Sequence, residues 1–176
     1  MPARVILAIF LAGLALVAAG CGKKDKPTAT QWANDFCGAV STWRDSLQTA
    51  ASSVTGGNVS KDSLQSAADD AKSATNKFVD TVRGLGKPPT DAGDKAQQEV
   101  DDLSDEIDAG TKTIQDATKN VHGITGALSA VSTVTATLST MGTQVQTTYE
   151  NLRQLDPQGE LQSAFHDADA CQNLKS

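Results

Sequence analysis

The chain has 176 residues, enough for an export signal and one domain of modest size. Its 15 lysines and arginines are outnumbered by 21 acidic residues, which gives a formal net charge of -6. This balance argues against a nucleic-acid partner, because contact with phosphates needs clustered cations. Only 4% of the residues are aromatic although 39% are hydrophobic, so the composition favours closely packed helices over a β-sandwich.

Residues 1–20 have the pattern of an export signal. Arg4 supplies a positive charge and residues 5–17 form an apolar run that contains a single glycine. A transmembrane helix needs about 20 apolar residues, so this shorter run is more typical of a signal peptide. The run closes on Leu16-Val17-Ala18-Ala19-Gly20-Cys21, in which small residues stand directly before a cysteine.

This closing motif resembles the lipobox of bacterial lipoproteins, although Ala18 stands where leucine is commoner. In that family the cysteine thiol receives a diacylglyceryl group, with palmitate among the expected acyl chains, and a peptidase cleaves before the cysteine. The resemblance implies that residues 1–20 are removed and that the lipid on Cys21 anchors the protein in the cell membrane, on its extracytoplasmic face. The alternatives are ordinary cleavage, which leaves a free Cys21 thiol, and an uncleaved anchor.

Residues 21–29 form the expected lipidated tether. Lys23, Lys24 and Lys26 could attract anionic head groups by about 1 kcal/mol each near the surface. We favour the simpler interpretation, a solvated spacer. The helical domain then occupies residues 30–174.

The first helix is predicted to begin near Thr30, because Thr28 and Gln31 have the spacing of a capping box. Its apolar residues fall at helical intervals on one face. They are Trp32, Phe36, Val40, Trp43, Leu47 and Val54. The two tryptophans could line a ligand site, but this spacing favours a place in the core.

A turn at residues 55–60 separates this helix from a second, which Ser60 can cap. Glycines and Pro88-Pro89 end the second helix, and a third segment is expected from Thr90 or Asp91. The apolar face of the second helix is Leu64, Ala68, Ala71, Phe78, Val82 and Leu85.

From Val100 onward, apolar residues follow a heptad repeat, which predicts helix packing of coiled-coil type. One set is Val100, Ile107, Ile114, Val121 and Leu128; the complementary set is Leu103, Ala117, Ile124, Val131, Leu138, Val145 and Leu152. Polar and apolar residues also alternate over residues 132–140, as in a strand. The helical period extends further in both directions, so we predict helix.

Two cysteines remain once Cys21 is assigned to the lipid. Cys37 and Cys171 lie near opposite ends of an exported domain, which predicts a disulfide; free buried thiols or a bond between chains are the alternatives. A bond requires Cα atoms within about 7 Å. An unbroken helix over residues 91–155 would run about 98 Å and hold the cysteines apart, so we expect the chain to reverse near Gly123.

The expected fold is therefore all-α, an antiparallel up-down bundle of four main helices. A short C-terminal helix should begin with Asp156 as its cap and Pro157 at its first position. The disulfide joins this helix to the first.

Residues that could carry chemistry are few. No nucleophile elbow, phosphate-binding loop or His-Glu-x-x-His motif occurs, and His122 falls in the expected turn. His166, beside Asp167 and Asp169, lacks further ligands for a metal. We therefore expect no catalytic, cofactor or metal site.

Two polar stretches have more than one interpretation. The acidic run of residues 99–108 does not match an EF-hand loop and is expected to be a solvated helix face. The Ser/Thr-rich residues 129–148 could face a partner, bond back to helix carbonyls or carry glycans, and the pattern does not separate these.

The signal, the Trp-rich first helix and the terminal cysteine together resemble small actinobacterial lipoproteins, a resemblance that implies no activity. The leading hypothesis is a non-enzymatic binding module for a protein or another envelope component. The alternative is a carrier of lipid or a small apolar ligand, with a groove between helices. A sensory input domain ranks third and an enzyme last.

Overall fold

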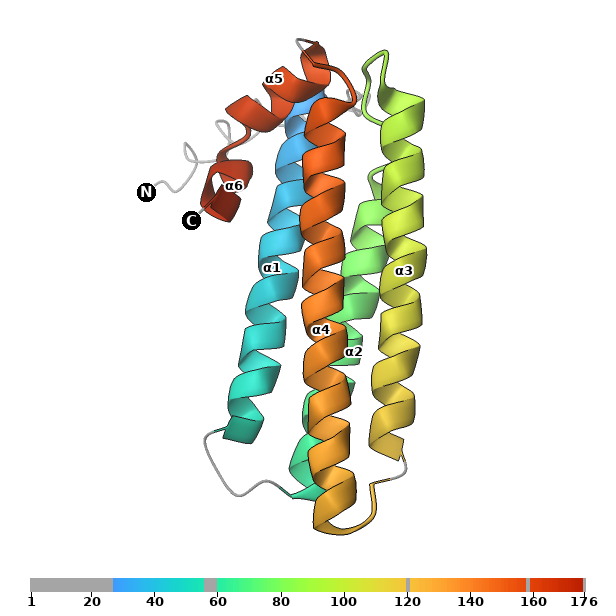
Figure 1. The fold of residues 1–176 in the computed structure, drawn as a ribbon. Helices are drawn as coiled ribbons and strands as arrows, with labels where there is room; N and C mark the ends of the chain where they lie inside the picture. Colours follow the sequence, from blue (N-terminus) through green and yellow to red (C-terminus); the bar gives the residue numbers. More distant parts are fainter. Residues whose placement is uncertain (1–26, 56–59, 120, 158, 176) are drawn as a thin grey trace, which may run out of the picture.

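The computed structural model describes residues 27–55, 60–119, 121–157 and 159–175. Four long helices run side by side, antiparallel in sequence order, and form an elongated bundle (Figure 1). They are α1 (Ala29–Thr55), α2 (Lys61–Gly84), α3 (Gly93–Lys119) and α4 (Gly123–Gln154). The predicted all-α up-down architecture is confirmed.

The two ends of the bundle differ. At the end called proximal below, α1 begins and the short helix α5 (Glu160–Asp167) lies across the ends of α1 and α4 (Figure 1). At the opposite, distal end, α1 and α3 end and α2 and α4 begin. The chain reverses between α3 and α4 with Gly123 at a positive φ of 66°, a conformation that glycine adopts without strain.

Two helix starts follow the predicted capping residues. The amide of Gln31 donates to Thr28 Oγ1 at 3.1 Å, and the Thr28 amide donates to Gln31 Oε1 at 3.0 Å. At α2, the Ser63 amide donates to Ser60 Oγ at 3.1 Å, and the Ser60 amide donates in return to Ser63 Oγ at 2.9 Å. These contacts satisfy backbone donors that have no partner within the helix.

The core is rich in alanine and valine, with aromatic side chains concentrated on α1 and at the proximal end. Trp32, Phe36, Trp43 and Phe165 are at most 2% exposed. The described members of the predicted α1 and α2 faces are buried or half-buried, and so are Val100, Leu103, Ile107 and Ile114 of α3. These placements confirm the 3.6-residue pattern as the main determinant of the fold.

The expected heptad seam breaks down at the start of α4. Leu128 was expected in the seam but is 67% exposed, and Val131 is 38% exposed. One phase cannot continue through a chain reversal, because the turn resets the direction in which each side chain points. Further along α4, Val145 and Leu152 are buried as expected. The segment 132–140 is helical, not a strand.

Several expectations lie outside the described residues. They concern the signal segment 1–20, the part of the tether that includes Cys21 and the three lysines, the turn glycines at 56–57, and the side chains of Val54 and Ile124.

The C-terminal region departs from the single helix that was expected. Helix α5 begins at Glu160, not at Pro157, and α3 likewise begins at Gly93 instead of Thr90 or Asp91. Ala168 then adopts an extended conformation, with φ -76° and ψ 117°, and separates α5 from α6 (Asp169–Gln172) and a final 3-10 turn, η1 (Asn173–Lys175). This break turns the chain so that α6 packs against the side of α1.

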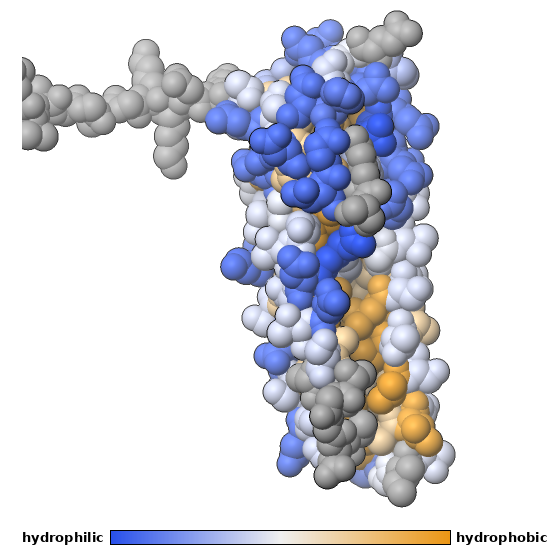
Figure 2. All heavy atoms as spheres, turned by 90° about the vertical axis from the view of Figure 1, so that its left-hand side faces the viewer, coloured by the Kyte–Doolittle hydropathy of each residue, from blue (hydrophilic) through white to orange (hydrophobic). Residues whose placement is uncertain are grey.

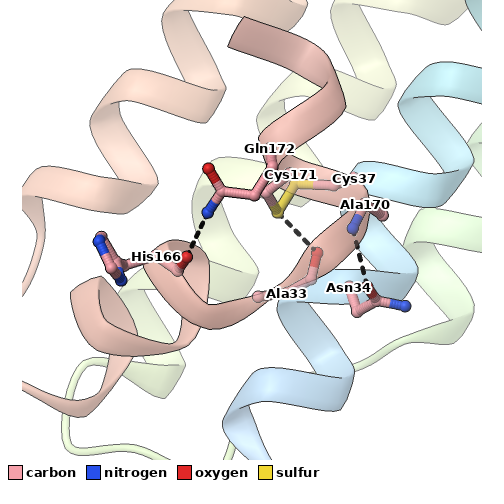
Figure 3. Close-up of a disulfide and its surroundings, with 7 residues drawn as sticks. All are labelled: Ala33, Asn34, Cys37, His166, Ala170, Cys171 and Gln172. Atoms are coloured by element: carbon pink, nitrogen blue, oxygen red, sulfur yellow. Dashed lines mark hydrogen bonds between the residues drawn. A yellow bond between two sulfur atoms is a disulfide. The ribbon is translucent and has the colours of Figure 1, made fainter.

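The predicted disulfide joins Cys37 of α1 to Cys171 of α6, with Cα atoms 5.0 Å apart (Figure 3). Both cysteines are fully buried. Beside the bond, the Ala170 amide donates to Asn34 Oδ1 at 3.0 Å, and Cys171 Sγ lies 3.4 Å from the carbonyl oxygen of Ala33. The C-terminal segment is thus held to α1 by both a covalent bond and a hydrogen bond.

Candidate functional site

The four long helices do not close into a complete ring. Helix α1 packs along α2, α2 along α3, and α3 along α4, whereas direct packing between the described parts of α1 and α4 is slight. The seam between α1 and α4 therefore needs another element to cover it. At the proximal end that element is α5.

Phe165 of α5 fills the proximal part of this seam. Its ring lies edge-on to Trp32 and Phe36 of α1, with centroids 6.1 Å away in each case, and edge-on to Tyr149 of α4 at 5.6 Å. Leu161 and Ala164 of the same helix are also buried. One short helix with apolar residues at i, i+3 and i+4 thus bridges two long ones.

The distal part of the same seam is an open apolar groove. The groove holds a cavity of about 160 Å³, and none of the side chains that line it is charged. Figure 2 shows the hydrophobic surface in the lower half of this face, below a largely hydrophilic upper half. The lining residues are Leu47, Ala50, Ala51, Leu64, Ala67, Ala68, Ala71, Thr118, Ala130, Val131, Val134, Thr135 and Leu138.

Alanines make the groove. Helix α2 contributes Ala67, Ala68 and Ala71, and α1 contributes Ala50 and Ala51. Small side chains on these helices leave the space that larger residues would fill in a closed core. The result is an apolar hollow in which the helix backbones lie close to the surface of the groove.

Helix α4 adds a long uncharged wall. It carries no Asp, Glu, Lys or Arg between Gly123 and Tyr149. Several of its hydroxyls donate to carbonyls one turn back, among them Thr137 to Thr133 at 2.8 Å, Thr140 to Ala136 at 3.1 Å and Thr143 to Ser139 at 3.0 Å. Of the three interpretations of this Ser/Thr-rich stretch, bonding back to the helix is thus observed. These internal bonds occupy hydroxyl protons that would otherwise bind water.

Two large hydrophobic side chains on this helix are exposed. Val131 forms part of the groove lining, and Leu128 precedes it by about one turn. Single exposed apolar residues are common on protein surfaces. Val131 thus extends the apolar surface of the groove to the solvent, and larger exposed apolar patches mark interaction sites.

The sequence-predicted special residues do not assemble into a second site. Cys37 and Cys171 form the structural disulfide and Cys21 lies outside the described residues. His122 is exposed at the N-terminus of α4; exposed His166 lies 2.9 Å from the carboxylate of its neighbour Asp167, and its backbone carbonyl accepts from the side-chain amide of Gln172. Among the described residues, no three His, Cys, Asp or Glu side chains are placed to hold a metal ion.

The tryptophans belong to the core, as their spacing indicated. Trp32 donates its indole N–H to the Gly86 carbonyl at 2.8 Å, and Trp43 donates to Thr75 Oγ1 at 3.1 Å. Trp43 also stacks on Phe78 with centroids 5.2 Å apart. Both polar groups are thereby satisfied, which leaves neither indole aimed at a ligand.

The acidic run of α3 is mostly solvated, as expected. Arg83 of α2 pairs with Asp105 at 2.6 Å and Asp108 at 3.4 Å, and Glu99 accepts a bond from the Asn151 amide at 3.0 Å. These contacts tie α3 to its neighbours at the surface. Exposed pairs of this kind contribute about 0–1 kcal/mol each.

The groove itself was not located from the sequence, although a groove between helices was anticipated for the carrier hypothesis. The available signal was the uncharged span of α4 together with alanines on the inner faces of α1 and α2. Those alanines fit a tight core equally well. Only the packing of the helices in three dimensions, with few contacts between α1 and α4, decides which outcome occurs.

The fold and groove define a class: a disulfide-linked helical bundle with an uncharged apolar groove along the distal α1–α4 seam. No described helix combines the length and the apolarity needed to cross a bilayer. No family model, curated protein or solved structure matches this chain.

Proposed function

We propose that the protein is a non-enzymatic binding module, anchored to the extracytoplasmic face of the cell membrane through lipid on Cys21, that recognises a protein of the cell envelope. The observation that carries this proposal is the uncharged apolar groove between the distal parts of α1 and α4, two helices whose described parts pack against each other only slightly. The lipobox-like motif before Cys21 supports the location.

The geometry supports a site held away from the anchor. Helix α1 begins at the proximal end, and the stretch between Cys21 and Thr28 spans at most about 25 Å even when fully extended. Leu47, in the groove lining, lies about 27 Å further along α1. An upright bundle would therefore present the groove to partners beyond the membrane surface.

The size of the groove favours a protein partner over a bound lipid. Pockets for small ligands usually measure about 300–1,000 Å³, whereas this cavity measures about 160 Å³. A hollow of about 150 Å³ accommodates a group the size of benzene. The groove thus suits one large side chain of a partner better than a complete acyl chain.

The alternative function is carriage of a lipid or small apolar ligand. The uncharged apolar lining is the observation that favours it. Native mass spectrometry of the lipidated protein separates the two functions. A second, non-covalent lipid that copurifies with the protein and is lost on Val131→Glu would support carriage and contradict the proposed function.

The direct test is photo-crosslinking in intact cells. A photoreactive amino acid at Thr135, an exposed residue of the groove lining, should form an adduct with an envelope protein. The matched control is the same replacement at Thr113, an exposed threonine on α3 outside the groove. The absence of protein adducts from both positions would contradict the proposed function.

A further inference from the structure

Helix α5 shows what kind of element the α1–α4 seam accepts. At the proximal end it buries Leu161, Ala164 and Phe165 between the two long helices. The distal groove is the continuation of the same seam, with the same two helices as its walls. Unlike the proximal part of the seam, the distal groove is not covered by any described segment of the chain.

We propose that the distal groove binds a short amphipathic helix of the envelope partner, packed between α1 and α4 as α5 is packed at the proximal end. This inference rests on the proposed function and specifies the chemistry of its partner. Insertion of a helix into a hydrophobic groove is a common mode of peptide recognition, with anchors at i, i+3 or i+4, and i+7.

The volume of the groove limits the size and number of side chains that the partner helix can insert. About 160 Å³ accommodates one side chain the size of leucine or phenylalanine. The alanines of α2 at the floor allow a close approach, so the residues beside this anchor should be small, such as alanine or valine. Helix α5 likewise buries one aromatic ring beside an alanine, together with Leu161 one turn earlier.

The charge of the groove limits the partner further. The lining has no ionic side chain, and α4 has none along its whole distal part. A charged residue on the docking stripe would lose its hydration without gaining a counter-charge. The partner helix must therefore present an uncharged stripe, with its charged residues confined to the opposite, solvated face.

The experiment identifies the segment that the groove holds. The full-length lipidated protein, with the photoreactive residue at Thr135, is crosslinked in cells, and the attached segment is sequenced by mass spectrometry. We expect a segment of another protein with apolar residues at i, i+3 or i+4, and i+7. A synthetic peptide of that segment should bind the purified protein and gain helical circular dichroism when it binds.

A matched pair of variants tests the groove. Val131 and Ser132 are adjacent and exposed on α4, but only Val131 lines the groove. Val131→Glu should weaken binding of the synthetic peptide at least tenfold, and Ser132→Glu should leave it within a factor of about two. Equal effects of both variants would overturn the proposal.

Other outcomes distinguish failure of this inference from failure of the proposed function. Protein adducts from Thr113 but none from Thr135 would overturn the groove as the docking site and leave the binding function standing. A segment without a helical apolar period, a segment of a second copy of this chain, or a lipid adduct would each overturn the helix proposal. No protein adduct from either position would overturn both.

Discussion

Phe165 of α5 packs edge-on against Tyr149 of α4 at the proximal end of the α1–α4 seam. The ring of Phe165 lies 5.6 Å from Tyr149 and 6.1 Å from Trp32, and so closes the proximal space between α4 and α1. Val134, also on α4, lies on the wall of the distal groove, where no described residue fills the space between α1 and α4 as Phe165 does at the proximal end. The α1–α4 seam is therefore filled at its proximal end, whereas no described segment covers it at its distal end.

The disulfide should dominate the stability of this domain. Cys37 and Cys171 are separated by 134 residues, and chain-entropy models give about 4–5 kcal/mol for so long a loop. We expect Cys37→Ser to lower the melting temperature by about 10–15 °C, measured by circular dichroism. Cys171→Ser and the double variant should have the same melting temperature as Cys37→Ser, because each removes the same bond. A wild-type melting curve unchanged by reductant would contradict this expectation.

The buried bond from Trp43 to Thr75 makes a smaller, measurable contribution. Thr75 is 2% exposed and accepts from the indole N–H at 3.1 Å. Thr75→Val keeps the shape but leaves that donor without a partner, which should cost about 1–3 kcal/mol in urea unfolding. Thr75→Ser retains the hydroxyl and should recover most of the hydrogen-bond energy, apart from the loss of one methyl group. Equal losses in the two variants would show that packing, not the bond, matters.

Substitution of alanine for glycine should have opposite effects on stability at two positions. A Cβ at Gly93 would lie 2.3 Å from the Pro88 carbonyl oxygen, which is backbone and cannot move aside easily. Gly142, in the middle of α4, has nothing within 4 Å of that position. We expect Gly93→Ala to destabilise by about 1–3 kcal/mol and Gly142→Ala to stabilise by about 0.5–1 kcal/mol, measured by chemical denaturation. A stabilised Gly93→Ala variant would contradict the close approach.

Separate cysteine variants should change membrane attachment and folding stability independently. Cys21→Ala removes the proposed lipid attachment without touching the described helices, so it should release the protein from the membrane fraction with the melting temperature unchanged. Cys37→Ser should leave the protein attached but less stable. Mass spectrometry of the mature N-terminus checks the premise, since a free Cys21 thiol or a start elsewhere in the chain would exclude lipidation.

The long helices could be predicted from the sequence because their determinants are local. Capping pairs such as Thr28 with Gln31, the apolar period of α1 to α3 and the glycines at the turns each act within a few residues. The disulfide followed from cysteine number and export, and it in turn required the reversal near Gly123. These inferences needed no knowledge of how far apart the helices lie.

What only the tertiary structure decided is the closure of the bundle. The apolar residues Leu161 and Phe165 of α5 and Val131 and Leu138 of α4 look alike in the sequence, yet the first pair is buried, Leu138 is half-buried and Val131 is exposed. Burial depends on the neighbouring helix: α5 packs against both α1 and α4, whereas no described segment packs over the distal part of the seam. A periodic pattern specifies which face of a helix is apolar, whereas the packing of whole helices determines whether that face is covered.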